Sequence, residues 1–181
     1  MKDIIKKITF NKYLRFLILA IFATNCYYVA QAQNHGSDAV ISVGVSYPNG
    51  LEASLAYEKE TSYHNAWEFY GNYYIKYAKD PEAGHITKKS FWDNYNIWSL
   101  GVAYKPCVSR GRNHHGNVRI GAFGGSDYHK FVGGGSIGYE HTFNLYNRCA
   151  VSFLVKEDVS ANTQDLFRTG IALSIKVPLS R

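Results

Sequence analysis

Long apolar runs and sustained helical periodicity are both missing from most of this sequence. After residue 33, no window keeps apolar residues at positions i, i+3, i+4 and i+7 over three turns, which excludes a helical bundle. The apolar stretch at residues 16–23 is too short for a membrane-crossing helix, which needs about 20 residues. The chain has one Met but 15 Tyr, 10 Phe, 3 Trp and 16 Gly, a composition that favours an all-β protein.

An excess of one charge is also missing once the N-terminus is set aside. The whole sequence has 20 Lys and Arg against 14 Asp and Glu. Residues 1–32 contribute five and one of these, so residues 33–181 carry 15 and 13, a net charge of +2. No concentrated basic face remains, and direct contact with nucleic acid is therefore not expected.

The first 32 residues have the order of a secretory signal peptide. Five basic residues accompany the short apolar core, and Ala30, Gln31 and Ala32 form a small-x-small cleavage signature. We predict cleavage after Ala32, which leaves one domain at residues 33–181. The alternative is a lipoprotein anchored at Cys26, but Asn25 is not the small residue expected before a lipidated cysteine.

The segment from Phe167 to Val177 shows the pattern that the rest of the domain repeats. Its odd-numbered residues are mostly bulky and apolar, whereas its even-numbered residues are small, polar or charged. An alternation of this length suits a tilted strand that crosses a bilayer, with one face toward lipid and the other toward a polar interior. We predict eight such strands, at residues 39–47, 51–59, 66–77, 95–105, 117–124, 131–143, 149–157 and 167–177.

This pattern predicts an all-β fold, an antiparallel up-and-down β-barrel of about eight strands and of the outer-membrane type. A soluble lipocalin-like barrel with its apolar faces inward is the architectural alternative. With the N-terminus in the periplasm, the long connection at residues 78–94 lies outside the cell. The basic segment at residues 106–116 is then expected to be a periplasmic turn.

The inward faces collect charged residues of both signs. They are Glu52, Glu58, Glu68, Lys76, Arg119, Glu140, Lys156, Arg168 and Lys176. The interior of an eight-stranded barrel is just wide enough to be filled by side chains. We therefore expect these charges to pair and close the lumen, rather than to line a narrow selective pore, because an unpaired buried charge is costly.

Two cysteines, Cys107 and Cys149, follow the predicted cleavage site. Both are expected on neighbouring hairpin ends at the periplasmic rim, in an oxidising compartment. The sequence leaves open whether they form a disulfide or remain two free thiols. His114 and His115 lie close to Cys107, but the spacing fits no established zinc pattern, so no metal or other cofactor is predicted.

One outer loop contains Ser126, Asp127 and His129, the residue types of a hydrolytic triad. Polar residues of these types are also common in turns, where they form local hydrogen bonds. We interpret them as turn residues, and no catalytic residue is predicted.

Five short segments near the C-terminus resemble one known family when they are taken in order. They are residues 138–142 (GYEHT), 144–147 (NLYN), 155–159 (VKEDV), 165–170 (DLFRTG) and 176–179 (KVPL). The string is similar to the C-terminal region of the TraO proteins encoded by Bacteroides-type conjugative transposons. The resemblance covers best the last third of the chain, and it contains no catalytic motif.

The resemblance implies a non-enzymatic outer-membrane component of a conjugative DNA-transfer apparatus, which anchors or docks other transfer proteins. Arg110, Arg112 and Arg148 are expected at the periplasmic rim and are the candidate docking residues. The expected partners are outer-membrane lipid and other conjugation proteins. The alternative is a free-standing small outer-membrane barrel, either a narrow porin or a surface adhesion protein.

Overall fold

The computed structural model of the chain describes residues 36–92, 94–145 and 149–179. The predicted signal peptide, residues 1–32, and the candidate docking residue Arg148 lie outside the described residues. None of the helices in the described part is long and apolar enough to cross a membrane.

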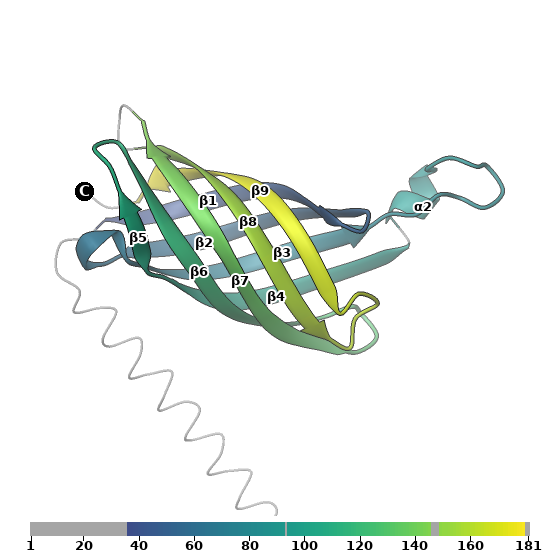
Figure 1. Ribbon diagram of the computed structural model, residues 1–181. Helices are drawn as coiled ribbons and strands as arrows, with labels where there is room; N and C mark the ends of the chain where they lie inside the picture. Colours follow the sequence, from purple (N-terminus) through teal and green to yellow (C-terminus); the bar gives the residue numbers. More distant parts are fainter. Residues whose placement is uncertain (1–35, 93, 146–148, 180–181) are drawn as a thin grey trace, which may run out of the picture. The chain divides into compact units, whose positions relative to one another are not determined.

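The described residues form one antiparallel sheet of nine strands that closes into a barrel (Figure 1). The strands are β1 (Ser37–Tyr47), β2 (Gly50–Glu60), β3 (Ala66–Lys76), β4 (Tyr95–Lys105), β5 (Cys107–Arg110), β6 (His114–Ser126), β7 (Phe131–Asn144), β8 (Ala150–Ala161) and β9 (Phe167–Pro178). The β1–β9 and β4–β6 pairings close the sheet. Because β5 is a four-residue continuation of β4 beside the same partner, β6, eight strands make up the wall. The predicted up-and-down β-barrel is confirmed.

Residues 106–116 do not form the long turn that the sequence predicted. Cys107 pairs with Asn117 and Arg110 pairs with His115, so the chain continues as a β-hairpin beyond the end of β4. Pro106 separates β4 from β5 because proline has no N–H to donate to the ladder. The turn itself is limited to residues 111–113, which satisfies the expectation of a short connection at this end.

The two faces of the wall have opposite chemistry. In β9, Leu173 and Ile175 face outward and are 57% and 56% exposed, whereas the inward side chains of Arg168 and Lys176 are each 3% exposed. Strands β1, β2, β4 and β7 show the same alternation. An apolar outer surface around a polar interior is the arrangement of an outer-membrane barrel and the opposite of a soluble lipocalin-like barrel.

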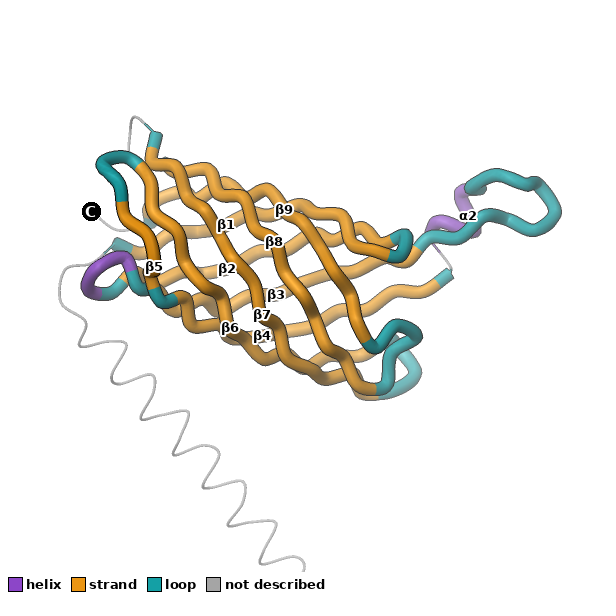
Figure 2. Tube along the Cα trace, in the orientation of Figure 1, coloured by secondary structure: helices purple, strands orange, loops and turns teal. Residues whose placement is uncertain are grey.

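The connections gather at the two ends of the barrel (Figure 2). The termini end contains the start of β1, the end of β9, and the β2–β3, β5–β6 and β7–β8 connections. The loop end contains the β1–β2, β3–β4, β6–β7 and β8–β9 connections. The longest of these, between β3 and β4, contains the short helix α2 (Lys88–Trp92) and projects from the loop end (Figure 1). A 3-10 turn, η1 (Ser62–His64), lies in the β2–β3 connection.

A small apolar cluster lies inside the barrel toward the loop end. It consists of Tyr74, Ile97 and Val132, which are at most 1% exposed, with Tyr95 and Phe123 packed against them. Most of the remaining buried side chains are polar or charged. The interior is therefore held together chiefly by polar contacts.

Candidate functional site

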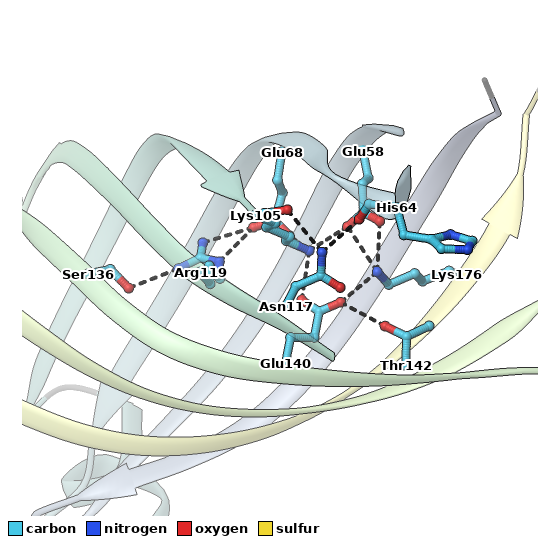
Figure 3. A network of polar contacts seen from close by, with 10 residues as sticks. All are labelled: Glu58, His64, Glu68, Lys105, Asn117, Arg119, Ser136, Glu140, Thr142 and Lys176. Carbon is cyan, nitrogen blue, oxygen red and sulfur yellow. Dashed lines mark hydrogen bonds and ion pairs between the residues drawn. The ribbon is translucent and has the colours of Figure 1, made fainter. Parts of the chain in front are cut away.

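Lys105 is the centre of an ion-pair network inside the barrel (Figure 3). Its Nζ lies 2.5 Å from Glu68 Oε2 and 2.7 Å from Glu140 Oε2, and it also forms an ion pair with Glu58. Lys176 is the second bridging cation, with its Nζ 2.7 Å from Glu58 Oε1 and 2.5 Å from Glu140 Oε1. All five side chains are almost completely buried, so each charge depends on its partners in place of water.

Arg119 extends the network toward the middle of the barrel. Its Nη2 and Nε donate to Glu68 Oε1 at 2.8 and 3.1 Å, and its Nη1 donates to Ser136 Oγ at 2.8 Å. The guanidinium also lies over the ring of Tyr70, 4.5 Å from its centroid. We call the following six residues the termini-end network: Glu58, Glu68, Lys105, Arg119, Glu140 and Lys176. Three acids balance three bases, so the network has no net charge.

The strand register explains why a lysine must lie at the centre. Glu58 and Glu68 are directly opposite each other on β2 and β3, and like charges in such cross-strand pairs destabilise a sheet. Lys105, the last residue of β4, contacts both carboxylates and reaches Glu140 on β7. Three carboxylates can be buried together because this ammonium group lies among them.

A second set of charges lies closer to the loop end. Lys156 Nζ is 2.5 Å from Glu52 Oε2 and 2.8 Å from Asp158 Oδ2. Arg168 is 3.8 Å from Asp158, and its guanidinium lies 4.5 Å from the centroid of the Tyr74 ring. We call Glu52, Lys156, Asp158 and Arg168 the loop-side cluster. It is also neutral overall, with two acids and two bases.

Two glycines make room for the lysine of this cluster. Gly138 and Gly170 are the register partners of Lys156 on its two neighbouring strands. A Cβ atom on Gly138 would approach the Lys156 Cβ to 3.0 Å and the Val155 carbonyl oxygen to 2.5 Å. Larger residues on the inward face of β7 would therefore displace the strand that carries Lys156.

Lys76 does not join either set of charges. The sequence grouped it with the other inward-facing charges, but it lies at the loop end, with its Nζ 2.6 Å from Asp165 Oδ2. This pair is 19% and 16% exposed, so it lies at the mouth of the barrel and not in the closed interior. Lys76 is the last residue of β3, and it contacts the β8–β9 connection rather than the inner wall.

The space left between the two sets of charges is small. A cavity of about 40 Å³ is lined by both sets, with Glu68, Arg119 and Glu140 on one side and Glu52 and Lys156 on the other. A cavity of this size holds only a few water molecules. Within the described residues, the interior is filled by side chains and is not an open water channel.

The acidic residues of the network have the spacing of a cation site. Carboxylate oxygens of Glu58, Glu68 and Glu140 all lie within 4.8 Å of one another. The ammonium group of Lys105 lies among them and supplies the positive charge itself. The arrangement therefore functions chemically as an internal salt bridge.

His114 and His115 point to opposite faces of β6. His115 is buried on the inner face and stacks on His64, with ring centroids 4.7 Å apart. His114 is exposed and stacks on His141 at 5.1 Å. Successive side chains of a strand alternate between its faces, so these two neighbours do not converge on one ligand.

Cys107 and Cys149 are free thiols, and the disulfide considered from the sequence is not formed. Cys107 lies on β5 and Cys149 directly precedes β8, so β6 and β7 lie between them in the sheet order. Three strand spacings of about 4.8 Å separate such positions by about 14 Å. A disulfide needs Cα atoms about 4.4 to 6.8 Å apart. The two cysteines therefore lie in the neighbouring β5–β6 and β7–β8 hairpins, but β6 and β7 keep them too far apart for a disulfide.

Two candidate docking residues lie at the tip of the β5–β6 hairpin at the termini end. Arg110 and Arg112 are both exposed. The Arg110 guanidinium lies over the ring of Tyr63, 5.1 Å from its centroid, and Tyr63 itself is 72% exposed. The hairpin thus presents basic and aromatic side chains together.

Ser126, Asp127 and His129 form a hydrogen-bonded turn, as predicted. Asp127 Oδ1 accepts hydrogen bonds from the backbone N–H groups of His129 and Lys130, at 3.1 and 2.8 Å. The bond from Lys130 is the main reason that the pKa of Asp127 is below its usual value. Ser126 Oγ donates to the Lys130 carbonyl and accepts from the Tyr128 N–H. The carboxylate and the hydroxyl are thus engaged in holding the turn.

Sequence reasoning missed two central residues, Lys105 and Asp158. Both lie at positions that the alternation already marks as inward. In a strand, residues i and i+2 face the same side. Lys105 comes two residues after the inward residue Ala103, and Asp158 comes two residues after the inward residue Lys156. Lys105 was left out because it is the last residue of its strand. Asp158 was assigned to a loop because β8 was predicted to end at residue 157, whereas it continues to Ala161.

Fold and interior together define an outer-membrane-type β-barrel with a closed, charge-paired lumen. No family model and no curated protein matches the sequence. Similar solved structures include a major outer membrane protein from Thermus thermophilus, with 11% identity, a TM-score of 0.49 and coverage of 79% of this chain and 100% of the other. The outer membrane protein Ail of Yersinia pestis has 10% identity and a TM-score of 0.47, with coverage of 78% and 99%. The de novo designed barrel TMB2.3 has 12% identity and a TM-score of 0.48, with coverage of 83% and 99%.

Proposed function

We propose that this protein is a non-enzymatic outer-membrane anchor that acts through its two ends and not through its lumen. The observation that carries the proposal is the neutral, buried termini-end network around Lys105, which fills the barrel where a pore would need an open path. A solute would have to break several buried ion pairs in order to pass. Contacts with other molecules are then left to the outer wall and the two rims.

The termini end has the features of a protein docking surface. Within the described residues β5 pairs only with β6, so no strand covers its other edge along Val108, Ser109 and Arg110; the Ser109 carbonyl accepts a hydrogen bond from the Cys107 thiol. An open strand edge can accept an extended segment of a partner through main-chain hydrogen bonds. Val108 is 59% exposed beside the basic residues of the hairpin, which favours a partner segment that is partly apolar and carries acidic side chains.

The partners that we propose are other proteins of a conjugative DNA-transfer apparatus. This part of the proposal rests on the resemblance of the last third of the sequence to the TraO family. The barrel would act as an outer-membrane attachment point for them. The small net charge after residue 32 does not favour a role in holding the DNA itself.

The test is the transfer frequency from donor cells that lack the gene, with and without a complementing copy. We expect transfer to collapse in the deletion and to return with the wild-type gene. The double variant Arg110→Glu/Arg112→Glu should complement poorly. The matched control, Lys88→Glu/Lys89→Glu, makes the same charge change at the loop end and should complement fully. Undiminished transfer from the deletion strain would exclude the transfer role.

A surface adhesion protein is the second candidate, and one observation favours it. The β3–β4 connection is held by a side-chain network: Asp80 accepts hydrogen bonds from the Glu82 N–H and the Thr87 hydroxyl, and both bonds contribute to a pKa of Asp80 below its usual value. This ordered loop exposes Trp92, 50% accessible, and Ile86, 45% accessible. Binding of cells to surfaces should fall with Trp92→Ser if adhesion is the function, while DNA transfer would be unchanged.

A further inference from the structure

The outer wall of the barrel has two grooves that share one ridge. The ridge consists of Trp98 and Leu100 on β4, which both line the two grooves. One groove, of about 480 Å³, lies on the β6–β7 side and is bounded by Gly124, Lys130 and Phe131. We call it the basic groove; its further lining residues are Gly125, Ser126, Tyr128 and His129.

The other groove, of about 460 Å³, lies on the β1–β3 side, and we call it the apolar groove. Ile41, Val43 and Leu55 form its wall, and Gly71 forms part of its floor. Gly71 is the register partner of both Leu55 and Leu100, so a residue without a side chain lies between two large ones. A Cβ atom added at Gly71 would meet only Leu100 Cδ2, at 3.4 Å. The groove exists because this position has no side chain.

The floor of the basic groove is formed in the same way. Gly124 is the register partner of Leu100 on β4 and of Gly133 on β7. The ring of Phe131 lies beside both glycines, 3.2 Å from the position of a Cβ on Gly124 and 3.1 Å from that on Gly133. Small residues thus leave space on both sides of the exposed ridge, and that space is lined mainly by apolar side chains.

Among the lining residues of the two grooves, Lys130 is the one permanent cation, and it lies at one end of the pair. His129 and Lys130 are exposed in the β6–β7 turn, at the loop end of the apolar outer surface. The acidic residue of the same turn, Asp127, is 7% exposed and accepts the backbone N–H groups of these two residues. Tyr128, 65% exposed, lies between the apolar wall and the basic side chains, the position that tyrosine favours at a membrane interface.

We propose that the Trp98–Leu100 ridge and its two grooves bind one anionic lipid. Its phosphate-bearing headgroup lies at His129 and Lys130, and its acyl chains lie in the basic and apolar grooves on either side of the ridge. A phosphate is the headgroup chemistry that the basic turn recognises, because charge-assisted hydrogen bonds to phosphate are strong. Two grooves that are lined mainly by apolar side chains and meet at one ridge fit a ligand with more than one acyl chain. The site is independent of the proposed role in transfer.

The test uses Trp98 as the reporter, in a Trp67→Phe/Trp92→Phe background that leaves it the sole tryptophan. The protein is reconstituted in phosphatidylcholine vesicles that contain a minor fraction of brominated phosphatidic acid or, in parallel, the same fraction of brominated phosphatidylcholine. Bromine quenches the fluorescence of a tryptophan that it touches. We expect clearly stronger quenching by the anionic lipid, because the site enriches it above its bulk fraction.

Two pairs of variants localise the effect. Lys130→Glu should reduce the enrichment at least about fivefold, which corresponds to the attraction of one basic residue for anionic lipid. Lys89→Glu, the same change on the β3–β4 connection, should leave it unchanged. Gly71→Val fills the apolar groove and should reduce quenching. Its control, Gly135→Val, adds the same side chain to an exposed position on β7 outside both grooves and should leave quenching unchanged. Heat-modifiable electrophoretic mobility verifies that each variant forms the barrel.

Three outcomes would overturn the proposal. Equal quenching by the two brominated lipids would mean that no anionic lipid is selected, and a cross-linked dimer in the same sample would assign the grooves to a second copy of the chain. Equal losses of lipid enrichment with Lys130→Glu and Lys89→Glu would mean that the general surface charge attracts the lipid and that there is no defined site. Undiminished quenching in Gly71→Val would remove the apolar groove from the site.

Discussion

The two halves of the barrel interior bury charge in different ways. In the termini-end network each carboxylate contacts at least two cations, and the contacts at Lys105 and Lys176 are short. In the loop-side cluster the contacts are fewer, the Arg168–Asp158 pair is long at 3.8 Å, and Arg168 relies partly on the faces of aromatic rings. Within these two sets, the buried polar atoms that lack a hydrogen-bond partner all belong to the loop-side cluster, at Glu52 Oε1 and at Arg168 Nε and Nη1.

This difference indicates which half of the interior is held more rigidly by its ion pairs. A buried charge that loses a partner is left without compensation, and the cost rises with the number of charges that depended on that partner. Lys105 forms ion pairs with three carboxylates. Arg168 forms an ion pair with one carboxylate, Asp158, which also pairs with Lys156. We therefore infer that the termini-end network is the rigid closure and that the loop-side cluster is the more adaptable half.

The largest effect is expected for Lys105→Met, which keeps most of the unbranched side chain and removes the charge. Three buried carboxylates lose their common cation, and breaking a buried pair in this way costs about 3 to 5 kcal/mol. The free energy of unfolding, measured by urea titration in detergent micelles or vesicles, should fall by this amount. Arg168→Met is the control from the loop-side cluster and should cost less, because its one carboxylate, Asp158, keeps Lys156. Equal losses for the two variants would contradict the contrast between the halves.

A smaller effect of opposite sign is expected when Ca²⁺ is added to a Lys105→Ala variant. The shorter side chain leaves space among Glu58, Glu68 and Glu140, whose oxygens lie within 4.8 Å of one another. Carboxylate oxygens are the ligands that Ca²⁺ prefers, at about 2.3 to 2.6 Å. Binding should raise the unfolding free energy of the variant by about 2.7 kcal/mol at a hundredfold excess over the dissociation constant. The wild-type protein, in which Lys105 fills the site, should show no such stabilisation.

The sequence predicted which residues face the interior but not which of them meet. Period-two alternation assigned eight of the nine predicted lumen charges correctly, because side-chain direction is a local property of a strand. The partners of Lys105 and Lys176, in contrast, are 35 to 118 residues away in the chain. Those contacts depend on strand tilt and stagger around the closed barrel, which no local pattern specifies.

Strand ends were the other source of error. Lys105 and Asp158 were missed because each lies at or beyond the predicted end of a strand. The hairpin at residues 107–117 was predicted as a turn because its alternation is brief and Pro106 interrupts it.

A moderate effect is expected for Arg168→Met in the loop-side cluster. Lys156 still compensates Asp158 in this variant. What is lost is a long ion pair, a hydrogen bond to Ser160 Oγ, and cation–π contacts with Tyr74 and Phe123. A desolvated cation–π contact contributes up to about 2 kcal/mol, so the unfolding free energy should fall by about 1 to 2 kcal/mol in the same urea titration. A loss as large as that of Lys105→Met would show that the loop-side half is as tightly coupled as the other.

The smallest effect is expected for the pair at the mouth of the barrel, Lys76 and Asp165. Both side chains are partly exposed, so water and salt screen their attraction, and such pairs contribute at most about 1 kcal/mol. Lys76→Met and Asp165→Asn should each lower the unfolding free energy by no more than this, and the double variant should add little to either single change because the two remove one interaction. High salt should lower the unfolding free energy of the wild-type protein toward that of the variants. The contribution of the buried pairs at Lys105 should not depend on salt. A salt-independent loss comparable to that of Arg168→Met would mean that the closed interior extends to the mouth itself.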